Sequence, residues 1–332
     1  MPAVPFHSPH DRRASGPRVA VMAAMATVLT FSLMAAACQP GAGGGGGGTT
    51  STTASTTTTT IASGSTVDPT HLPLGDGKYT STPTRGYITT CQTSFPPGGG
   101  GAGSKGSWFN ADGKTWDSTK KLVVQGNVKW TSRLTTSVAN GYRTFSGNDL
   151  PNHSTGVFPI STSDPVYQYD RNPNAINTQV ISVKIPSSPT VAATPTCIRG
   201  EVGIVLTGAA LFDGFDAGGR DAVAWEAQDT CGGHPQMDGA YHYHNLTKCI
   251  SDPGTGQSNL LGYAYDGFGI YGNRGPNGKA MTNADLDACH GTTSPVMWDG
   301  KLVTMYHYVA AKEFPYTVGC FKGTPTQNQF TG

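Results

Sequence analysis

Alternation of apolar and polar residues with a period near two predicts that this chain folds mainly into β-strands. Residues 121–130 and 178–185 alternate in this way, and residues 201–211 are mostly apolar and β-branched, as in a buried strand. Clusters of Gly, Pro, Asn and Asp separate these segments and are typical of turns. Helical patterns are confined to residues 221–228 and 283–288. We therefore expect one mainly-β domain, a sandwich or a curled sheet with one or two short helices.

The N-terminal part of the chain has a different pattern, which predicts an export signal followed by a tether. A basic start, an uncharged apolar stretch and three alanines lead to Cys38. This order resembles a lipoprotein-type signal peptide over residues 1–38, in which Cys38 becomes the lipidated first residue; a plain signal peptide or an uncleaved anchor is the alternative. Residues 39–66 are rich in Gly, Ser and Thr without a charge, which is typical of a disordered linker. The folded domain is expected over residues 67–332.

The cysteine count supports export. Once Cys38 is set aside, the chain has six cysteines, an even number that is typical of disulfides in an exported protein. Six cysteines allow many pairings, so spacing alone does not fix the connectivity. Nearness in sequence favours two pairs, Cys231 with Cys249 and Cys289 with Cys320, which leaves Cys91 with Cys197 as the third. We expect an extracytoplasmic protein, periplasmic or on the cell surface, that is disulfide-braced and held to a membrane by its lipid anchor.

Charge and composition exclude several classes of function. Lys and Arg number 22 against 21 Asp and Glu, and charged residues make up 13% of the chain against a norm of roughly 25%. A net charge of +1 argues against a nucleic-acid partner, which requires a basic face. The 13 Tyr, 12 Phe and 5 Trp residues leave a small-molecule or glycan ligand open, because aromatic rings offer stacking surfaces.

The densest group of candidate site residues lies between Cys231 and Cys249. His242 and His244 alternate with two tyrosines, so in an extended strand both imidazoles leave the same face, with Cα atoms about 6.6 Å apart. Two such imidazoles can bind one metal ion, and either His234 or Asp238 is expected as the third ligand or as an acceptor that fixes the imidazole tautomer. We expect this site to lie in a pocket open to solvent. Zinc and copper both suit imidazole ligands, and the ligand type does not separate them.

Other residues could complete the site or make it reactive. His153, in a turn-like segment, and His307, in a second Tyr-His-Tyr, are further candidate metal ligands. Asp238 and Asp266 are the candidates for a catalytic carboxylate, although both lie in turn-like segments. Alternating Tyr and His is also typical of an ordinary half-buried strand with its histidines on the wetter face. The concentration of three histidines and Asp238 in one short segment favours the metal site.

Residues 239–245, with the sequence GAYHYHN, resemble the signature of the bacterial YHYH-domain family. The resemblance extends over residues 120–323 through seven further blocks, at 152–156, 212–214, 231–234, 262–272, 285–291, 306–308 and 314–320. In the second Tyr-His-Tyr, Val309 stands where a further His would complete the tetrapeptide, which leaves His307 alone there. The resemblance implies an exported domain with a shared site and no assigned reaction.

Three hypotheses of different classes follow. The first is an extracytoplasmic lipoprotein domain that binds a transition metal through the Tyr-His-Tyr-His strand. The second is a metal-dependent hydrolase at the same residues, which requires an open coordination position for water. The third is a structural or glycan-binding surface protein without enzymatic activity, in which the histidines are incidental. The sequence leaves open whether the protein is an enzyme.

Overall fold

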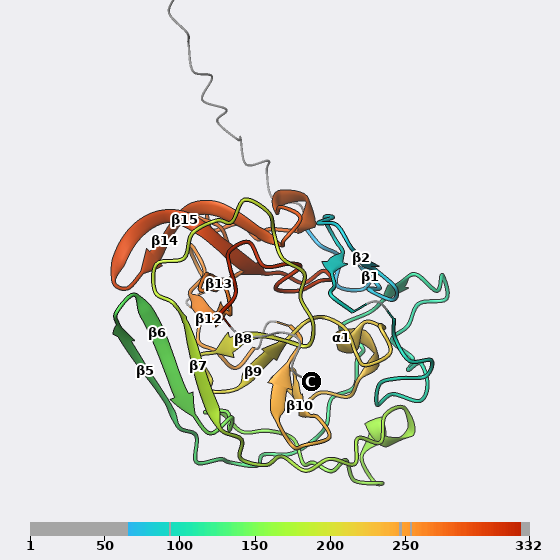
Figure 1. Ribbon diagram of the computed structural model, residues 1–332. Helices are drawn as coiled ribbons and strands as arrows, with labels where there is room; N and C mark the ends of the chain where they lie inside the picture. The colour runs from blue at the N-terminus through green and yellow to red at the C-terminus, as the bar shows by residue number, and fades with distance from the viewer. Residues whose placement is uncertain (1–65, 93, 246–247, 253, 327–332) are drawn as a thin grey trace, which may run out of the picture. The chain divides into compact units, whose positions relative to one another are not determined.

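The computed structural model describes residues 66–92, 94–245, 248–252 and 254–326, all within a compact unit that spans residues 58–332. The predicted signal peptide and linker lie outside the described residues. The prediction of a mainly-β fold with few short helices is confirmed (Figure 1). Across the described residues, no helix is long and apolar enough to cross a bilayer.

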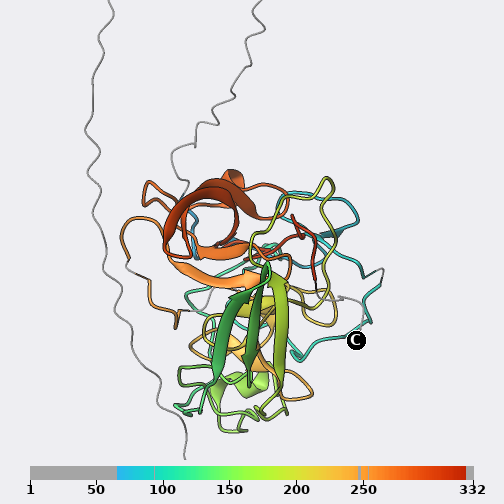
Figure 2. The same cartoon turned by 60° about the vertical axis from the view of Figure 1, so that its left-hand side comes forward.

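An eight-stranded sheet forms the centre of the domain, with strand order β10-β11-β9-β8-β12-β13-β15-β14. Its strands are β8 (Glu201–Val205), β9 (Ala210–Phe212), β10 (Gly233–Pro235), β11 (Tyr241–Tyr243), β12 (Leu260–Ala264), β13 (Gly269–Gly272), β14 (Gly291–Trp298) and β15 (Lys301–Ala310). Figures 1 and 2 show the long β14–β15 hairpin as a strongly curled band, so the sheet is curled rather than flat.

Smaller elements surround this sheet. A three-stranded sheet, in front in Figure 2, consists of β5 (Leu134–Ala139), β6 (Tyr142–Gly147) and β7 (Ile181–Pro186). Two strand pairs join β1 (Leu72–Pro73) with β4 (Thr115–Trp116) and β2 (Tyr79–Thr80) with β3 (Ile88–Thr89). The helices are single turns: α1 (Ala222–Trp225) and the 3-10 turns η1 (Pro165–Gln168) and η2 (Asn283–Asp285).

The core lies between the central sheet and the three-stranded sheet. Phe145 of β6 is fully buried and its ring centroid lies 5.3 Å from that of Tyr263 on β12. Arg143 of β6 lies over the rings of Tyr263 and Trp298, at 4.7 and 5.3 Å. Its Nη2 also donates to both carboxylate oxygens of Asp299, at 2.7 and 2.8 Å. The two sheets are therefore joined by apolar contacts and by one buried cation with both π and ionic partners.

Three disulfides brace the domain, and they are the pairs expected from the sequence. Their Cα–Cα distances are 5.1, 5.3 and 4.6 Å, within the range of unstrained bridges. The pairs are Cys91–Cys197, Cys231–Cys249 and Cys289–Cys320. Such bridges are typical of an extracellular or periplasmic protein.

Two of the predicted strands are wrong in extent. Residues 121–130 make only isolated bridges, at Val124 and Val128, and Gly126 between them has φ +145°. Residues 201–211 form two strands instead of one, since Gly208 at φ +101° closes a tight turn between β8 and β9. Both predicted helices shorten to a single turn. The conformation of Gly208, which an apolar pattern does not report, accounts for the division of residues 201–211.

Candidate metal centre

The β10–β11 hairpin positions two of the three histidines of the cluster. His234 on β10 is the register partner of His242 on β11, so the two side chains lie side by side on one face. Gly239, at φ +89°, allows the tight turn between the strands. Asp238 belongs to this turn: it is exposed, and its Oδ1 accepts from the N–H of Ala240 at 3.0 Å. The candidate catalytic Asp238 therefore shapes the hairpin and does not face the cluster.

His234, His242 and His244 come together as the sequence pattern predicts. One potential ligand atom from each lies within 4.8 Å of those of the other two. The Nε2 atoms of His242 and His244 are 3.1 Å apart. The expectation of a pocket open to solvent is wrong, because the three residues are only 4%, 3% and 2% exposed. The cluster is a closed site.

Backbone carbonyls fix the tautomers of two of these rings. Nδ1 of His242 lies 3.2 Å from the carbonyl oxygen of Ala240, and Nδ1 of His244 lies 2.5 Å from that of Asp213. A carbonyl oxygen can only accept, so each Nδ1 carries the proton and donates. In the neutral rings both Nε2 atoms therefore present lone pairs, and they face each other. Two facing lone pairs repel each other unless a cation or a proton lies between them. The hydrogen bonds from Nδ1 to backbone carbonyls are the usual outer contacts of metal-bound histidine.

Glu226, which the sequence analysis missed, supplies a fourth donor. It ends α1, and its Oε2 lies 3.5 Å from Nε2 of His234 and 3.6 Å from Nε2 of His244. Bonds of roughly 2.0–2.1 Å at tetrahedral angles would place neighbouring donors about 3.3 Å apart, close to these separations. Among the residues that the structure describes, neither ring nitrogen of His234 has a hydrogen-bond partner, which is costly for a buried group. The four side chains therefore surround a position suited to a metal ion.

The backbone around α1 holds Glu226 in place. Its N–H donates to the carbonyl of Ala222 at 2.9 Å, and its own carbonyl accepts from the buried ammonium of Lys121 at 2.7 Å. The Gly-rich segment 96–106 covers it, with the N–H of Gly101 3.4 Å from Oε1. The only sequence signal for Glu226 was its position as the single charged residue in the segment Ala222–Ala227.

Burial shifts every pKa in the cluster toward the neutral form. Desolvation lowers the pKa of His242 to about 4 and that of His244 to about 3, and it lowers the pKa of His234 well below its usual value. Desolvation, with the charges of Asp216 and Asp170, raises the pKa of Glu226 to about 8. The histidines are therefore neutral and free to bind a metal at neutral pH, and protons do not relieve the contact between their nitrogens.

The opposite face of β11 packs into the core. Tyr241 and Tyr243 are fully buried, which stiffens the strand that carries the histidines. His153, a predicted metal ligand, lies on this side: its Nε2 is 2.6 Å from the hydroxyl of Tyr243. It is also near Cys231 and Cys249, but those two sulfurs are bonded to each other. The structure thus separates His153 from the histidine cluster by the thickness of the strand.

Two further candidates lie in the other half of the sheet. His307 on β15 is buried, its Nδ1 is 3.2 Å from the carbonyl oxygen of Met305, and its ring packs on Tyr271 at 5.2 Å. Asp266 is buried and accepts from the hydroxyl of Tyr308 at 2.5 Å and from the N–H of Gly323 at 2.8 Å. Neither residue joins the histidine cluster. Asp266 has the contacts of a structural carboxylate.

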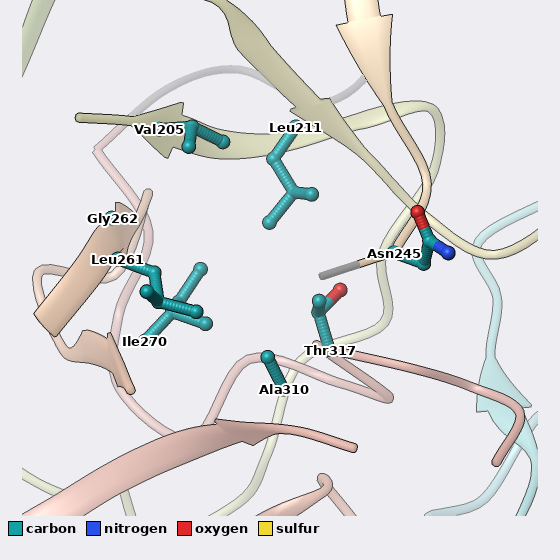
Figure 3. A pocket seen from close by; sticks show the side chains of 8 residues that line it. All are labelled: Val205, Leu211, Asn245, Leu261, Gly262, Ile270, Ala310 and Thr317. Carbon is teal, nitrogen blue, oxygen red and sulfur yellow. The ribbon is translucent and has the colours of Figure 1, made fainter. Parts of the chain in front are cut away.

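A small cavity lies beside the central strands, and it is not an alternative to the histidine cluster as the candidate site. Figure 3 shows it between aliphatic side chains of β8, β9, β12 and β13, with Asn245 and Thr317 at one side. It has room for about one water molecule. The Asn245 Oδ1 and the Thr317 Oγ1 lack hydrogen-bond partners among the described residues. The cavity fits a buried water and is too small for an organic substrate.

Comparison with known proteins gives one finding. The family model described as YHYH protein matches residues 182–282, a shorter stretch than the expected 120–323. The matched stretch includes Glu226, His234, His242 and His244. No curated protein and no solved structure matches the chain. The stretch that matches this family model therefore contains all four donors of the buried cluster.

Proposed function

We propose that this domain binds one zinc ion through His234, His242, His244 and Glu226. The observation that carries the proposal is the pair of Nε2 lone pairs that face each other at 3.1 Å, with both Nδ1 atoms committed to backbone carbonyls. A cation between them turns a buried repulsion into two ligand bonds. The unpartnered ring of His234 and the carboxylate of Glu226 extend the same set to four donors.

Geometry and charge favour zinc over copper. Donor separations of 3.1, 3.5 and 3.6 Å are close to the edges of a tetrahedron, the geometry that zinc adopts in closed four-ligand sites, whereas copper(II) prefers tetragonal sites. A dication also offsets the unfavourable burial of an ionised Glu226. The set then consists of three neutral ligands and one anion.

Burial favours stable binding over catalysis. A zinc hydrolase keeps a coordination position for water. The four donors here would fill the four positions of a tetrahedral ion, and the four residues are at most 8% exposed. We therefore place metal binding ahead of the hydrolase alternative. Asp238 and Asp266, the proposed catalytic carboxylates, do not reach the cluster. Nothing in the contacts of the site favours glycan binding.

Elemental analysis tests the proposal. Protein refolded with its disulfides intact and dialysed against trace zinc should retain one zinc per chain, and His242→Ala plus His244→Ala should retain none. The matched control is His307→Ala, which removes a buried strand histidine outside the cluster and should retain one. Zinc-free wild-type protein with an unchanged circular dichroism spectrum would contradict the proposal. Preferential retention of copper would correct the metal and keep the site.

We further propose that the protein is exported and anchored to a membrane through a lipid on Cys38. The three disulfides support an oxidising compartment. Mass spectrometry of the membrane fraction should show a diacylglyceryl-modified N-terminal cysteine, and Cys38→Ala should remove the lipid. Unmodified soluble protein in the wild type would contradict the anchor, without bearing on the metal site.

A further inference from the structure

The two halves of the eight-stranded sheet have the same connectivity. Each half consists of two consecutive hairpins. The last strand of the second hairpin pairs in parallel with the last strand of the first hairpin: β11 with β9 in one half, and β15 with β13 in the other. The strand order therefore reads outward from the central β8–β12 pair in the same way on both sides (Figure 1). The central pairing is symmetric: Ile204 faces Tyr263, while Gly262 faces Val205 and Gly203 faces Ala264.

Side-chain contacts repeat as well as strands. Asp229 Oδ1 accepts from the N–H groups two and four residues later, at 2.9 and 3.3 Å, and Asp287 Oδ1 does the same at 2.9 and 3.0 Å. Each aspartate also accepts from the tyrosine hydroxyl that opens the Tyr-His-Tyr strand, Tyr241 at 2.8 Å and Tyr306 at 3.1 Å. Each aspartate is followed two residues later by a disulfide cysteine.

The second tyrosine of each strand is held in the same way. The hydroxyl of Tyr243 lies 2.9 Å from Thr207 Oγ1, and that of Tyr308 lies 2.5 Å from Asp266 Oδ2. Thr207 and Asp266 both occupy the turn of the first hairpin in their half, directly before a glycine with positive φ. The two halves therefore share a frame of backbone, carboxylate and tyrosine contacts at matching positions, although the oxygen that accepts from the tyrosine hydroxyl differs between them.

This frame assigns each metal donor a counterpart in the second half. His234 pairs with His242, and Thr292 pairs with His307, so His307 corresponds to His242 and Thr292 to His234. Val309 follows His307 by two residues, as His244 follows His242. Where Glu226 faces His244, the apolar Met281 and Leu286 pack with Val309.

We propose that the second half keeps the backbone frame of a second metal position in which only one of the three matching residues, His307, is a histidine. The inference rests on the proposed metal binding by the first half. It predicts that histidines at positions 292 and 309 complete a site for a divalent transition metal. Position 292 is half-buried and position 309 fully buried, so the rebuilt site would be nearly as closed as the first.

The test counts zinc by elemental analysis after equilibrium dialysis. Thr292→His plus Val309→His should raise the zinc content from one to two per chain. In a background of His242→Ala plus His244→Ala, the same two changes should give one zinc per chain, and addition of His307→Ala should give none. Cobalt(II) substitution should show tetrahedral visible absorption in that background.

The outcomes separate this inference from the proposed function. If wild-type protein binds one zinc and the rebuilt variant still binds one, the second position is wrong and the first site stands. If wild-type protein binds none and the rebuilt variant binds one, the proposed function is wrong and the second position stands. If neither binds zinc, both are wrong.

Val309→His changes a fully buried residue, so a milder variant covers the case in which the rebuilt protein does not fold. Thr292→His alone places a histidine across the strands from His307. It should bind nickel(II) at least about tenfold more tightly than Thr293→His, whose side chain leaves the other face of β14. His307→Ala should abolish the difference. Equal nickel affinity in Thr292→His and Thr293→His would overturn the inference.

Discussion

The two halves of the central sheet bury different chemistry on the same frame. Between β10, β11 and α1 the first half encloses three imidazoles and a carboxylate, whereas the second half places Thr292, His307 and Val309 at the matching positions. In both halves an aspartate, two tyrosines and a disulfide hold the strands. The comparison shows that the shared backbone, aspartate and tyrosine contacts do not depend on the histidine cluster, because the tyrosines and the histidines leave opposite faces of the same strand.

The difference has an energetic consequence. Buried imidazole nitrogens without partners destabilise a folded protein unless something binds them. The first half carries this cost at His234 and at the facing nitrogens of His242 and His244, and a bound cation offsets it. The second half replaces two of these groups by smaller or apolar ones, and its stability should be independent of metal.

Metal binding should therefore stabilise the domain through its first half alone. Zinc at about 1,000 times its dissociation constant should raise the free energy of unfolding by about 4 kcal/mol. His242→Ala should remove this gain, and His307→Ala should keep it. Urea unfolding with and without a chelator measures both. A gain in His242→Ala equal to that of wild-type protein would place the ion elsewhere.

Acid should destabilise the second half through His290, a buried histidine that is not in the cluster. Burial lowers its pKa from 6.5 to about 4, although its Nδ1 lies 2.8 Å from the carbonyl oxygen of Thr317 and Asp287 acts in the opposite direction. Between these two pH values the unfolded chain binds a proton that the folded chain does not. The contribution of neutral His290 to the free energy of unfolding is fully present above pH 6.5, and it is lost as the pH falls toward 4.

His290→Asn tests this pH dependence. Asparagine tolerates the φ of +71° at this position and can donate to the Thr317 carbonyl. In metal-free protein, the variant should lose less stability than wild-type protein between pH 7 and pH 4, by up to about 3 kcal/mol. Urea unfolding at a series of pH values gives the difference. Parallel curves for the two proteins would show that His290 does not resist protonation.

The sequence predicts the part of this molecule that depends on local pattern. Alternation predicted a mainly-β fold, and it placed His242 and His244 on one face, because side chains of a strand alternate whatever surrounds it. Nearness in sequence was enough to favour two of the disulfide pairs, and the third followed from the cysteines that remained. His234 was one of two candidates for the third ligand, and its place beside His242 is set by the short β10–β11 turn that the structure shows.

Other features required the tertiary structure. Glu226 reaches the cluster because α1 ends beside β10, and nothing in the pattern of residues 221–228 reports that contact. The closure of the site likewise comes from covering segments distant in sequence, such as Gly101. His153 illustrates the converse: a histidine in the right family block lies behind the strand instead of on its ligand face.

The tyrosine–aspartate contacts should contribute unequally in the two halves. Among the described residues, Tyr241→Phe leaves the buried Asp229 Oδ2 with the N–H of Gly156, at 3.2 Å, as its remaining partner, and it should cost about 2 kcal/mol. Tyr306→Phe should cost about 1 kcal/mol, because the side chain of Asp287 is 32% exposed and also binds Lys322 at 2.9 Å. Chemical unfolding of both variants measures the costs. Equal losses would mean that solvent does not replace the missing bond at Asp287.

The smallest effect is expected at His153, and it separates support of the strand from metal ligation. His153→Phe removes a half-buried contact of 2.6 Å to the hydroxyl of Tyr243, which still has Thr207 at 2.9 Å. Stability should fall by about 1 kcal/mol, the usual worth of one hydrogen bond. Zinc affinity, measured by competition with a chromogenic chelator, should stay within about twofold of the wild-type value, because the histidines of β11 face the other way. A loss of more than about 100-fold, beyond the effect of outer hydrogen-bond partners, would instead make His153 a ligand and require the strand to present both faces to the ion.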